Sequence, residues 1–388
     1  MADPVAVFPT EEFDRRRAAL QAGMAEHGLD ALLLTGAADI FYVTGFLTRF
    51  WESPARPWFV ILPARGAAVA VIPEIGRLLM SHCSVGEIRN WPAPDPSDDG
   101  VTLLAGTLSD LVPETGNIGL PMGLETSLRM PLADYHRVVT AIAPRCFVDA
   151  TEVVQRVREI KSEAEIAKIR TICGIADRAF DRVPAIVAND PRLDAVFRGF
   201  QSVLLEEGAD WVSYTAGGAG QGGYGDVISP AAPVLLRSGD VLMLDTGAVK
   251  DGYFCDFDRN YAIGLPSDDV RRAHAALFSA TETVLEQLRP GMTARELHAM
   301  LTRDLIARGA VPGGGRLGHG LGVTLTEWPS FTDRDGTVLR ENMVLTLEPS
   351  VEIAPGKILV HEEDIVLRAG GPELLTRRCP ADLPVIMP

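Results

Sequence analysis

The sequence is short of cysteine and of positive charge for a chain of 388 residues. Its five cysteines are scattered and form no Cys-x-x-Cys pair, so neither a disulfide framework nor a thiolate zinc site is indicated. The 36 Lys and Arg residues are outnumbered by 52 Asp and Glu residues, which gives a formal net charge of −16. Because affinity for nucleic acids comes largely from Lys and Arg, this balance argues against a nucleic-acid partner.

Long apolar runs and targeting signals are also missing. The first residues lead into Glu11 and Glu12 without a basic or apolar leader, so we expect no signal peptide. No stretch approaches the roughly 18 uninterrupted apolar residues of a membrane-spanning helix, so we expect no membrane partner. A reducing cytoplasm fits this composition and the unpaired cysteines best.

Apolar residues make up 47% of the chain, enough for two or three domains with their own cores. The first part alternates apolar runs, such as Ala31–Leu34 and Trp58–Leu62, with helix-like stretches, and this predicts an α/β domain over residues 1–155. The spacing of Ser162 and Glu165 is typical of a capping box that opens a long helix. Long helices interleaved with strands then predict an α+β domain over residues 156–388.

Three aspartates gather on a predicted hairpin. An apolar strand ends at Asp245, and after a turn a second strand carries Asp256 and Asp258. Because strand side chains alternate with period two, either plausible turn register places the three carboxylates on one face. Like charges opposite one another destabilise a hairpin unless something neutralises them, and a divalent cation would do so. An exposed acidic hairpin face is the alternative.

Three further segments carry groups that bind metals. His319 lies between two glycines, where a ligand can reach its imidazole. Glu348 ends an apolar strand, and a buried carboxylate there needs a partner or a metal. The run from His361 to Asp364 places charges between two apolar stretches, and period two points part of it inward. A turn histidine and a charged strand edge are the alternative interpretations.

Together these segments form an ordered set of five residues: Asp245, Asp256, His319, Glu348 and Glu363. With the surrounding Asp-x-Gly-Ala, Asp-x-x-Arg-Asn, Gly-His-Gly-x-Gly, Glu-Pro and Glu-Asp motifs, the set resembles the metal site of the pita-bread metallopeptidases of the prolidase, aminopeptidase P and creatinase branch. The resemblance implies a creatinase/prolidase-like α/β amino-terminal domain followed by an α+β pita-bread catalytic domain. It also implies that the five residues hold two divalent metal ions, Mn, Co, Zn or Fe.

The acid–base residues depart from the family pattern. The usual His-Glu-x-Pro motif starts here with Thr326, and none of the seven histidines lies between Val183 and Asp245, where the family carries one that acts on the scissile group. His361 stands where prolidase-like members often have arginine, and Asp258 replaces a Thr or Ser. The candidates for the displaced catalytic roles are Glu327, His361, Asp258, Asp226 and Tyr224.

Three activities stay open on this pattern. The first is a metal-dependent hydrolase that cuts a C–N bond in a dipeptide or small amide, similar to an Xaa-Pro peptidase but acting on a non-standard small substrate. The second is a metal-dependent lyase of the dimethylsulfoniopropionate-cleaving type, and the third a metal-free hydrolase like creatinase or ectoine hydrolase. The resemblance also implies a homodimer in which the amino-terminal domain of one subunit reaches the partner's active site. The loop 46–56, with Arg49 and Trp51, is our candidate for that contact, and a helix-to-strand connection with buried rings is the alternative.

Overall fold

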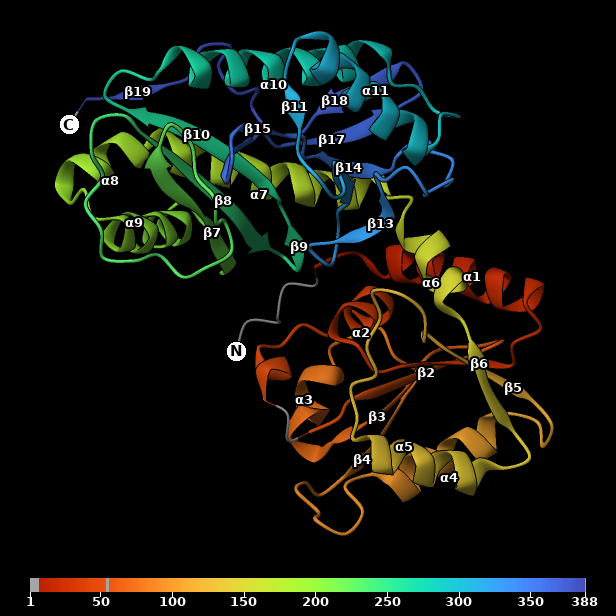
Figure 1. Ribbon diagram of the computed structural model, residues 1–388. Coiled ribbons are helices and arrows are strands. Elements are labelled where there is room, and N and C mark those ends of the chain that lie inside the picture. Colours follow the sequence, from red (N-terminus) through yellow and green to blue (C-terminus); the bar gives the residue numbers. More distant parts are fainter. Residues whose placement is uncertain (1–6, 54–55, 388) are drawn as a thin grey trace. The chain divides into compact units, whose positions relative to one another are not determined.

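The computed structural model describes residues 7–53 and 56–387. The chain divides into two compact units, Met1–Arg158 and Glu159–Pro388 (Figure 1). The start of the chain, for which we expect no signal peptide, lies outside the described residues up to residue 6. Two residues of the loop 46–56, Pro54 and Ala55, also lie outside them. In the described part of the chain, no helix combines the length and the apolar character needed to cross a membrane.

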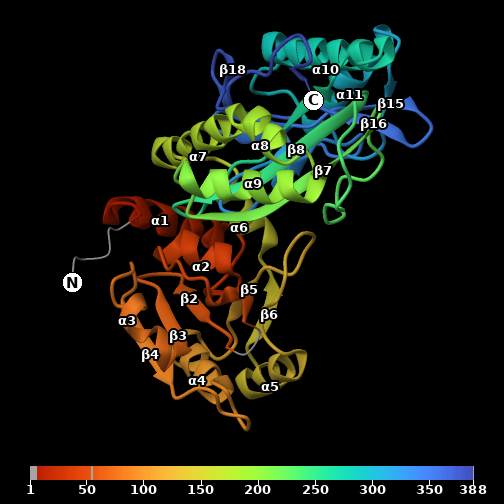
Figure 2. The ribbon, with the colours of Figure 1, turned by 90° about the vertical axis from the view of Figure 1, so that its left-hand side faces the viewer.

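The amino-terminal unit is built on one mixed sheet of six strands in the order β4-β3-β2-β1-β5-β6. One face packs against α4 and α5 through a core that includes Leu33, Leu104 and Val138 (Figure 2). The predicted α/β domain is confirmed. Its strands are β1 (Ala31–Leu34), β2 (Phe59–Pro63), β3 (Val69–Pro73), β4 (Glu87–Trp91), β5 (Asn117–Leu120) and β6 (Cys146–Asp149). Its helices are α1 (Thr10–Glu26), α2 (Ala37–Thr44), α3 (Arg77–Met80), α4 (Val101–Leu111), α5 (Leu132–Ile142) and α6 (Thr151–Arg158), with 3-10 turns at Phe50–Glu52 and Glu74–Gly76.

The aromatic loop of this unit is held by its own unit. The guanidinium of Arg129 lies 5.0 Å from the centre of the Trp51 ring and donates to the Trp51 carbonyl oxygen at 2.9 Å. The Trp51 ring also lies 6.1 Å from the ring of Trp58. Arg49, in contrast, is exposed, and its guanidinium lies 3.4 Å from the carboxylate of the neighbouring Glu52.

The second unit is a pair of sheets and a small third sheet between two groups of helices. Helices α7 and α9 contact the sheet β19-β10-β8-β7, and α10 contacts β15, β16 and β18 on the opposite side (Figure 1). The other sheets run β13-β12-β14-β17-β18 and β11-β15-β16. The strands are β7 (Trp211–Gln221), β8 (Asp240–Lys250), β9 (Tyr253–Phe254), β10 (Phe257–Ile263), β11 (Val311–Pro312), β12 (Gly318–Gly320), β13 (Glu327–Ser330), β14 (Val344–Leu347), β15 (Ser350–Ala354), β16 (Lys357–Val360), β17 (Glu363–Arg368), β18 (Gly371–Leu374) and β19 (Val385–Ile386).

The helices of this unit begin where the sequence places caps. They are α7 (Glu163–Asp181), α8 (Val183–Asn189), α9 (Leu193–Glu206), α10 (Asp268–Gln287) and α11 (Ala294–Ala307). The capping box of Ser162 and Glu165 is present at the start of α7: the Ser162 hydroxyl accepts from the Glu165 N–H, and the Glu165 carboxylate accepts from the Ser162 N–H. Such a reciprocal cap satisfies backbone donors that the first helical turn leaves unpaired.

The hairpin that carries the aspartates has one definite register. Asp258 of β10 lies opposite Asp245 of β8. The turn centres on Asp251 and Gly252, both at positive φ (52° and 81°). Asp and Gly are the residue types that adopt this left-handed region at low cost. Of the two possible registers, this is the one that places Asp245 directly against Asp258.

Candidate metal centre

Three side chains from three separate segments converge at the centre of the second unit. Asp256 precedes β10, His319 lies on β12, and Glu362 precedes β17. One ligand atom from each lies within 4.8 Å of the others, and all three residues are buried. His319 Nε2 lies 3.3 Å from Asp256 Oδ2. Two carboxylates and an imidazole at this spacing match the ligand preferences of first-row divalent metals.

Two further carboxylates extend this group. Burial and the charges of Asp256 and Asp258 raise the pKa of Asp245 well above its ordinary value. Burial and the charge of Asp256 raise the pKa of Glu348, which the imidazole of His319 opposes. The Tyr214 hydroxyl contacts both Asp245 and Asp256, and the Glu348 N–H donates at 3.0 Å to the carbonyl oxygen of Leu317, two residues before His319.

The carboxylates of this group form no ion pair with Lys or Arg in the described part of the chain. Burial and the charges of Asp256, Glu348 and Asp245 raise the pKa of Glu362 well above its ordinary value. Across the part of the chain that the structure describes, none of these four carboxylates pairs with a Lys or Arg side chain. Buried charges need a partner or a metal, so the donor set fits bound cations.

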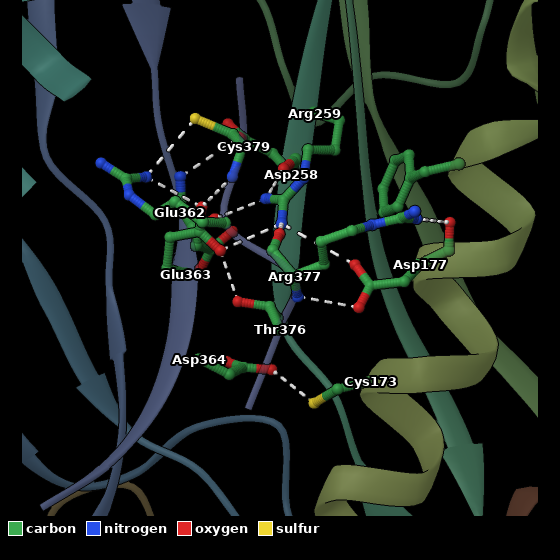
Figure 3. Close-up of polar contacts among 12 residues, drawn as sticks. Cys173, Asp177, Asp258, Arg259, Glu362, Glu363, Asp364, Thr376, Arg377 and Cys379 are labelled. Carbon is green, nitrogen blue, oxygen red and sulfur yellow. Dashed lines mark hydrogen bonds and ion pairs between the residues drawn. The ribbon is translucent and has the colours of Figure 1, made fainter. Parts of the chain in front are cut away.

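Glu363 lies on the other side of its strand. Its carboxylate pairs with Arg259 Nη2 at 3.0 Å and with Arg378 Nη1 at 2.9 Å, and it accepts from the Thr376 hydroxyl (Figure 3). These contacts lower the pKa of Glu363 despite its burial. Because successive strand residues point to opposite faces, Glu362 faces the candidate ligands and Glu363 cannot. The structure therefore groups Glu362, rather than the expected Glu363, with Asp256 and His319.

Asp258 is the one predicted acid–base residue that lies against the ligand group. Its Oδ1 accepts from the Glu362 N–H at 3.1 Å, and its buried Oδ2 has no hydrogen-bond partner in the described residues (Figure 3). Burial raises the pKa of Asp258 to about 8. Its position opposite Asp245 places it on the same face of the hairpin as that candidate ligand.

Glu327 is buried but already neutralised. Its Oε2 pairs with Lys161 Nζ at 2.9 Å, and its Oε1 accepts from the Thr324 N–H at 3.2 Å. A Cβ atom on Gly322 would lie 2.8 Å from both carboxylate oxygens, which explains why the Gly-His-Gly-x-Gly motif ends in glycine. The Glu327 carboxylate is thus paired with the buried Lys161 in this structure.

His361 belongs to a second, separate group with Glu363 and Cys379. The position that a metal would take is filled by a guanidinium: Arg378 Nη1 lies 2.7 Å from His361 Nε2, 2.9 Å from Glu363 Oε1 and 3.4 Å from Cys379 Sγ. Burial lowers the pKa of His361 to about 4, so its imidazole is a neutral acceptor. The structure does not bring His361 to the candidate metal centre.

Tyr224 and Asp226 also have other roles. The buried Tyr224 hydroxyl donates to Asn260 Oδ1 at 2.9 Å and accepts from the Val360 N–H at 2.7 Å, so both of its hydrogen-bonding functions are used. Asp226 is exposed and accepts from the N–H groups of Ile228 and Ser229, which closes a turn. Neither side chain joins the ligand group.

Two residues that the sequence analysis missed touch the candidate ligands. The Tyr214 hydroxyl, on β7, lies within hydrogen-bond distance of Asp256 Oδ1 and of Asp245 Oδ2 (3.1 Å). Asp364 Oδ2 accepts from the Asp256 N–H at 3.0 Å and from the Cys173 thiol at 3.4 Å (Figure 3). Both contacts join segments far apart in the chain, so no local pattern could reveal them.

Comparison with known protein families agrees with this architecture. Residues 167–368 match metallopeptidase family M24, and residues 16–160 match the creatinase/prolidase N-terminal domain. The chain belongs to metallopeptidase family M24. The predicted family and the predicted pita-bread fold behind a creatinase/prolidase-type domain are confirmed, and the M24 chain is a hydrolase of the metallopeptidase type.

Relatives of this M24 chain share its full two-unit organisation. The probable dipeptidase PepE of Mycobacterium tuberculosis is 28% identical over 386 residues, which cover 98% of both chains. The Xaa-Pro dipeptidase of Pyrococcus horikoshii is 26% identical over 361 residues, or 91% of this chain and 94% of that protein. The crystal structure of dipeptidase PepE from Mycobacterium ulcerans matches with a TM-score of 0.83 and 26% identity, covering 98% of this chain and 100% of the other.

Proposed function

We propose that this M24 chain is a dipeptidase that uses two divalent cations, held by Asp245, Asp256, His319, Glu348 and Glu362. The observation that carries the proposal is the buried carboxylate group around His319, in which no carboxylate forms an ion pair with an arginine or lysine within the described residues. Bound metal ions of this kind lower the pKa of a coordinated water and polarise the bond to be cut.

The protein side chains would position and protect this centre. Tyr214 holds Asp245 and Asp256 in one orientation through its hydroxyl. The Asp364 carboxylate holds the backbone of Asp256 by accepting a hydrogen bond from its N–H. We assign to Asp258 Oδ2, a free acceptor on the same face as Asp245, the role of accepting a hydrogen bond or proton from the substrate.

The dipeptide substrate class is transferred from two relatives that are named as dipeptidases, one of them for Xaa-Pro dipeptides. Thr326 stands where peptidases of this type usually carry a histidine, so the preferred dipeptide is expected to differ from the usual ones. The lyase and the metal-free hydrolase are the competing activities, and they leave different products and different metal requirements.

A substrate screen with measured metal content tests the proposal. Protein is stripped with a chelator and reloaded with Mn, Co, Zn or Fe, and each form is assayed on Xaa-Pro and other dipeptides, creatine, ectoine and dimethylsulfoniopropionate. We expect about two equivalents of metal and release of two amino acids from a dipeptide. Full activity of the stripped protein would refute the metal requirement, and an alkene product would establish the lyase instead.

We also propose that the enzyme is a homodimer in which Arg49 of the loop 46–56 reaches the partner's substrate. Arg49 is exposed, whereas the Trp51 ring is covered by Arg129, so the arginine is the better candidate for an outward contact. Sedimentation gives the oligomeric state, and Arg49→Ala is expected to raise KM without changing metal content. A monomer with full activity would contradict both parts.

A further inference from the structure

Arg129 ties together a loop that has little regular structure of its own. The loop 46–56 lies between α2 and β2, and among its described residues the regular structure is a single 3-10 turn. The guanidinium of Arg129 donates to three carbonyl oxygens of this loop, those of Trp51 at 2.9 Å, Ser53 at 2.5 Å and Arg56 at 2.9 Å. Because hydrogen bonds from a charged donor are stronger than those between neutral groups, this one side chain fixes the course of the loop backbone.

Arg129 is itself anchored to the sheet of the amino-terminal unit. Its backbone N–H donates to Thr35 Oγ1 at 3.1 Å, and Thr35 is buried and directly follows β1. The guanidinium also lies 5.0 Å from the centre of the Trp51 ring, a distance at which the face of an indole attracts a cation. The loop is therefore held from the sheet of its own subunit.

The loop has an inner and an outer face. Phe46 is fully buried, and its ring centre lies 6.4 Å from that of Trp51. Leu47 and Phe50 are exposed, with 42% and 52% of their surface accessible, and Arg49 between them in sequence is exposed as well. Exposed apolar side chains beside an arginine are typical of a surface that contacts another protein.

Arg129 acts through backbone carbonyl groups and not through an ion pair. Across residues 7–53 and 56–387, the structure gives its guanidinium no carboxylate partner. Replacing Arg129 therefore leaves no buried acid without its counter-ion, and the freed carbonyl oxygens of a surface loop can bond to water. A neutral side chain at this position should loosen the loop without unfolding the unit around it.

We propose that Arg129 is a positioning residue that holds the loop 46–56 in the form in which Arg49 reaches the partner's substrate. This inference rests on the proposed homodimer and names the residue that sets the conformation of the contacting loop. The loop does not need the partner to order it, because Arg129 fixes it from within its own subunit. Such preorganisation removes the cost of ordering a flexible loop from the binding of the substrate.

Limited proteolysis tests whether Arg129 holds the loop. Trypsin cuts after Arg49 but not after Arg56, because a proline follows Arg56, so the fragment that ends at Arg49 reports on this loop. In Arg129→Met the fragment should appear at least about tenfold faster than in the wild-type protein. Arg129→Lys keeps a charged donor that can reach part of the carbonyl group and should lie between the two.

Matched controls separate loosening of the loop from general instability. Arg137→Met removes an exposed arginine of α5 whose ion pairs lie at the surface, and it should be cut at the wild-type rate. Melting temperature, metal content and sedimentation are measured for every variant. Should Arg129→Met fail to fold, Thr35→Val removes the hydrogen bond that anchors the backbone of Arg129, and it is expected to speed cleavage after Arg49 about two- to fivefold.

Kinetics test whether the held loop matters for the substrate. On the substrate that the screen identifies, Arg129→Met is expected to raise KM about 3- to 10-fold with kcat largely kept. The double variant Arg49→Ala/Arg129→Met should show the KM of Arg49→Ala alone, because both changes remove the same contact. Two independent roles would instead multiply the two effects, which would overturn the inference.

Mixed dimers test whether the loop acts across the two subunits. Arg129→Met subunits, which keep the candidate metal centre, are combined with Asp256→Ala subunits, which keep the wild-type loop. In such a dimer the intact centre is served by the wild-type loop of its partner, so KM should return to the wild-type value. A KM that stays raised would show that the loop acts on its own subunit and would overturn the inference.

The remaining outcomes separate the inference from the homodimer on which it rests. If Arg49→Ala raises KM and Arg129→Met does not, or if Arg129→Met is cut no faster than the wild-type protein, the role of Arg129 is overturned and the homodimer stands. Dissociation of Arg129→Met into monomers would also overturn a role limited to positioning. If the wild-type protein is a monomer with full activity, the homodimer proposal itself fails, and the inference falls with it.

Discussion

Glu362 and Glu363 are adjacent acids for which the structure predicts opposite consequences of the same substitution. Glu362 faces the candidate ligands Asp256 and His319, whereas Glu363 pairs with Arg259 and Arg378. Glu362→Gln and Glu363→Gln each remove one negative charge with almost no change in volume. The two variants are therefore matched controls for each other.

For Glu363→Gln we expect a large loss of stability. Removing one partner of a buried ion pair leaves an uncompensated charge and costs about 3–5 kcal/mol. In a unit of this size, 1 kcal/mol corresponds to about 2–4 °C, so the melting temperature should fall by about 6–20 °C. Metal binding, measured well below the new melting temperature, should stay close to that of the wild-type protein.

For Glu362→Gln we expect the stability of the metal-free protein to be kept and metal binding to be lost. Its carboxyl already holds its proton more tightly than usual in the metal-free protein, so an uncharged amide should leave the metal-free melting temperature nearly unchanged. Metal affinity should fall by more than the roughly 10- to 100-fold that loss of an outer hydrogen-bond partner costs. Calorimetric unfolding of chelator-treated protein and titration with Mn give the two quantities. Wild-type metal affinity in Glu362→Gln would refute the ligand assignment, and an unchanged melting temperature in Glu363→Gln would refute the ion-pair argument.

Three further outcomes follow from the site. The raised pKa values of Asp245 and Glu362 mean that the folded, metal-free protein keeps protons that the unfolded chain releases. Its melting temperature should therefore fall as pH rises above the ordinary carboxyl range of about 4, and added Mn should reverse the fall; a flat profile would contradict this. Tyr214→Phe should lower metal affinity about 10- to 100-fold, whereas Tyr261→Phe, whose hydroxyl donates to the Phe180 carbonyl oxygen, should not. His361→Gln should leave the shape of the pH–rate profile unchanged in the neutral range, because the pKa of His361 is about 4; a lost inflection would show that it takes part in proton transfer.

Local sequence carries much of this fold because its signals act over short distances. Ser162 and Glu165 cap a helix three residues apart, and Asp251 with Gly252 fixes the register of a tight hairpin. Within that hairpin, period two places Asp245 and Asp258 on one face whatever the surroundings.

The choice between Glu362 and Glu363 was beyond the sequence. Both residues precede an acidic residue, so the motif fits two frames, and the facing side depends on how β17 pairs with β14. The neutralising Arg259 and Arg378 lie on other segments, 104 and 15 residues from Glu363. Glu362 and Glu363 have the same side chain, so only the residues around each carboxylate make their pKa values and their roles different.

The sequence by itself determined the family, the two-unit organisation and the residue types of the candidate metal centre, since these depend on ordered motifs and on strand periodicity. The tertiary structure decided which acid lies with Asp256 and His319, and that His361 is a neutral acceptor in a separate group with Arg378. The physical reason is that burial and charge pairing depend on contacts between distant segments. Such contacts set the pKa and the orientation of each side chain, and they cannot be predicted from the local sequence.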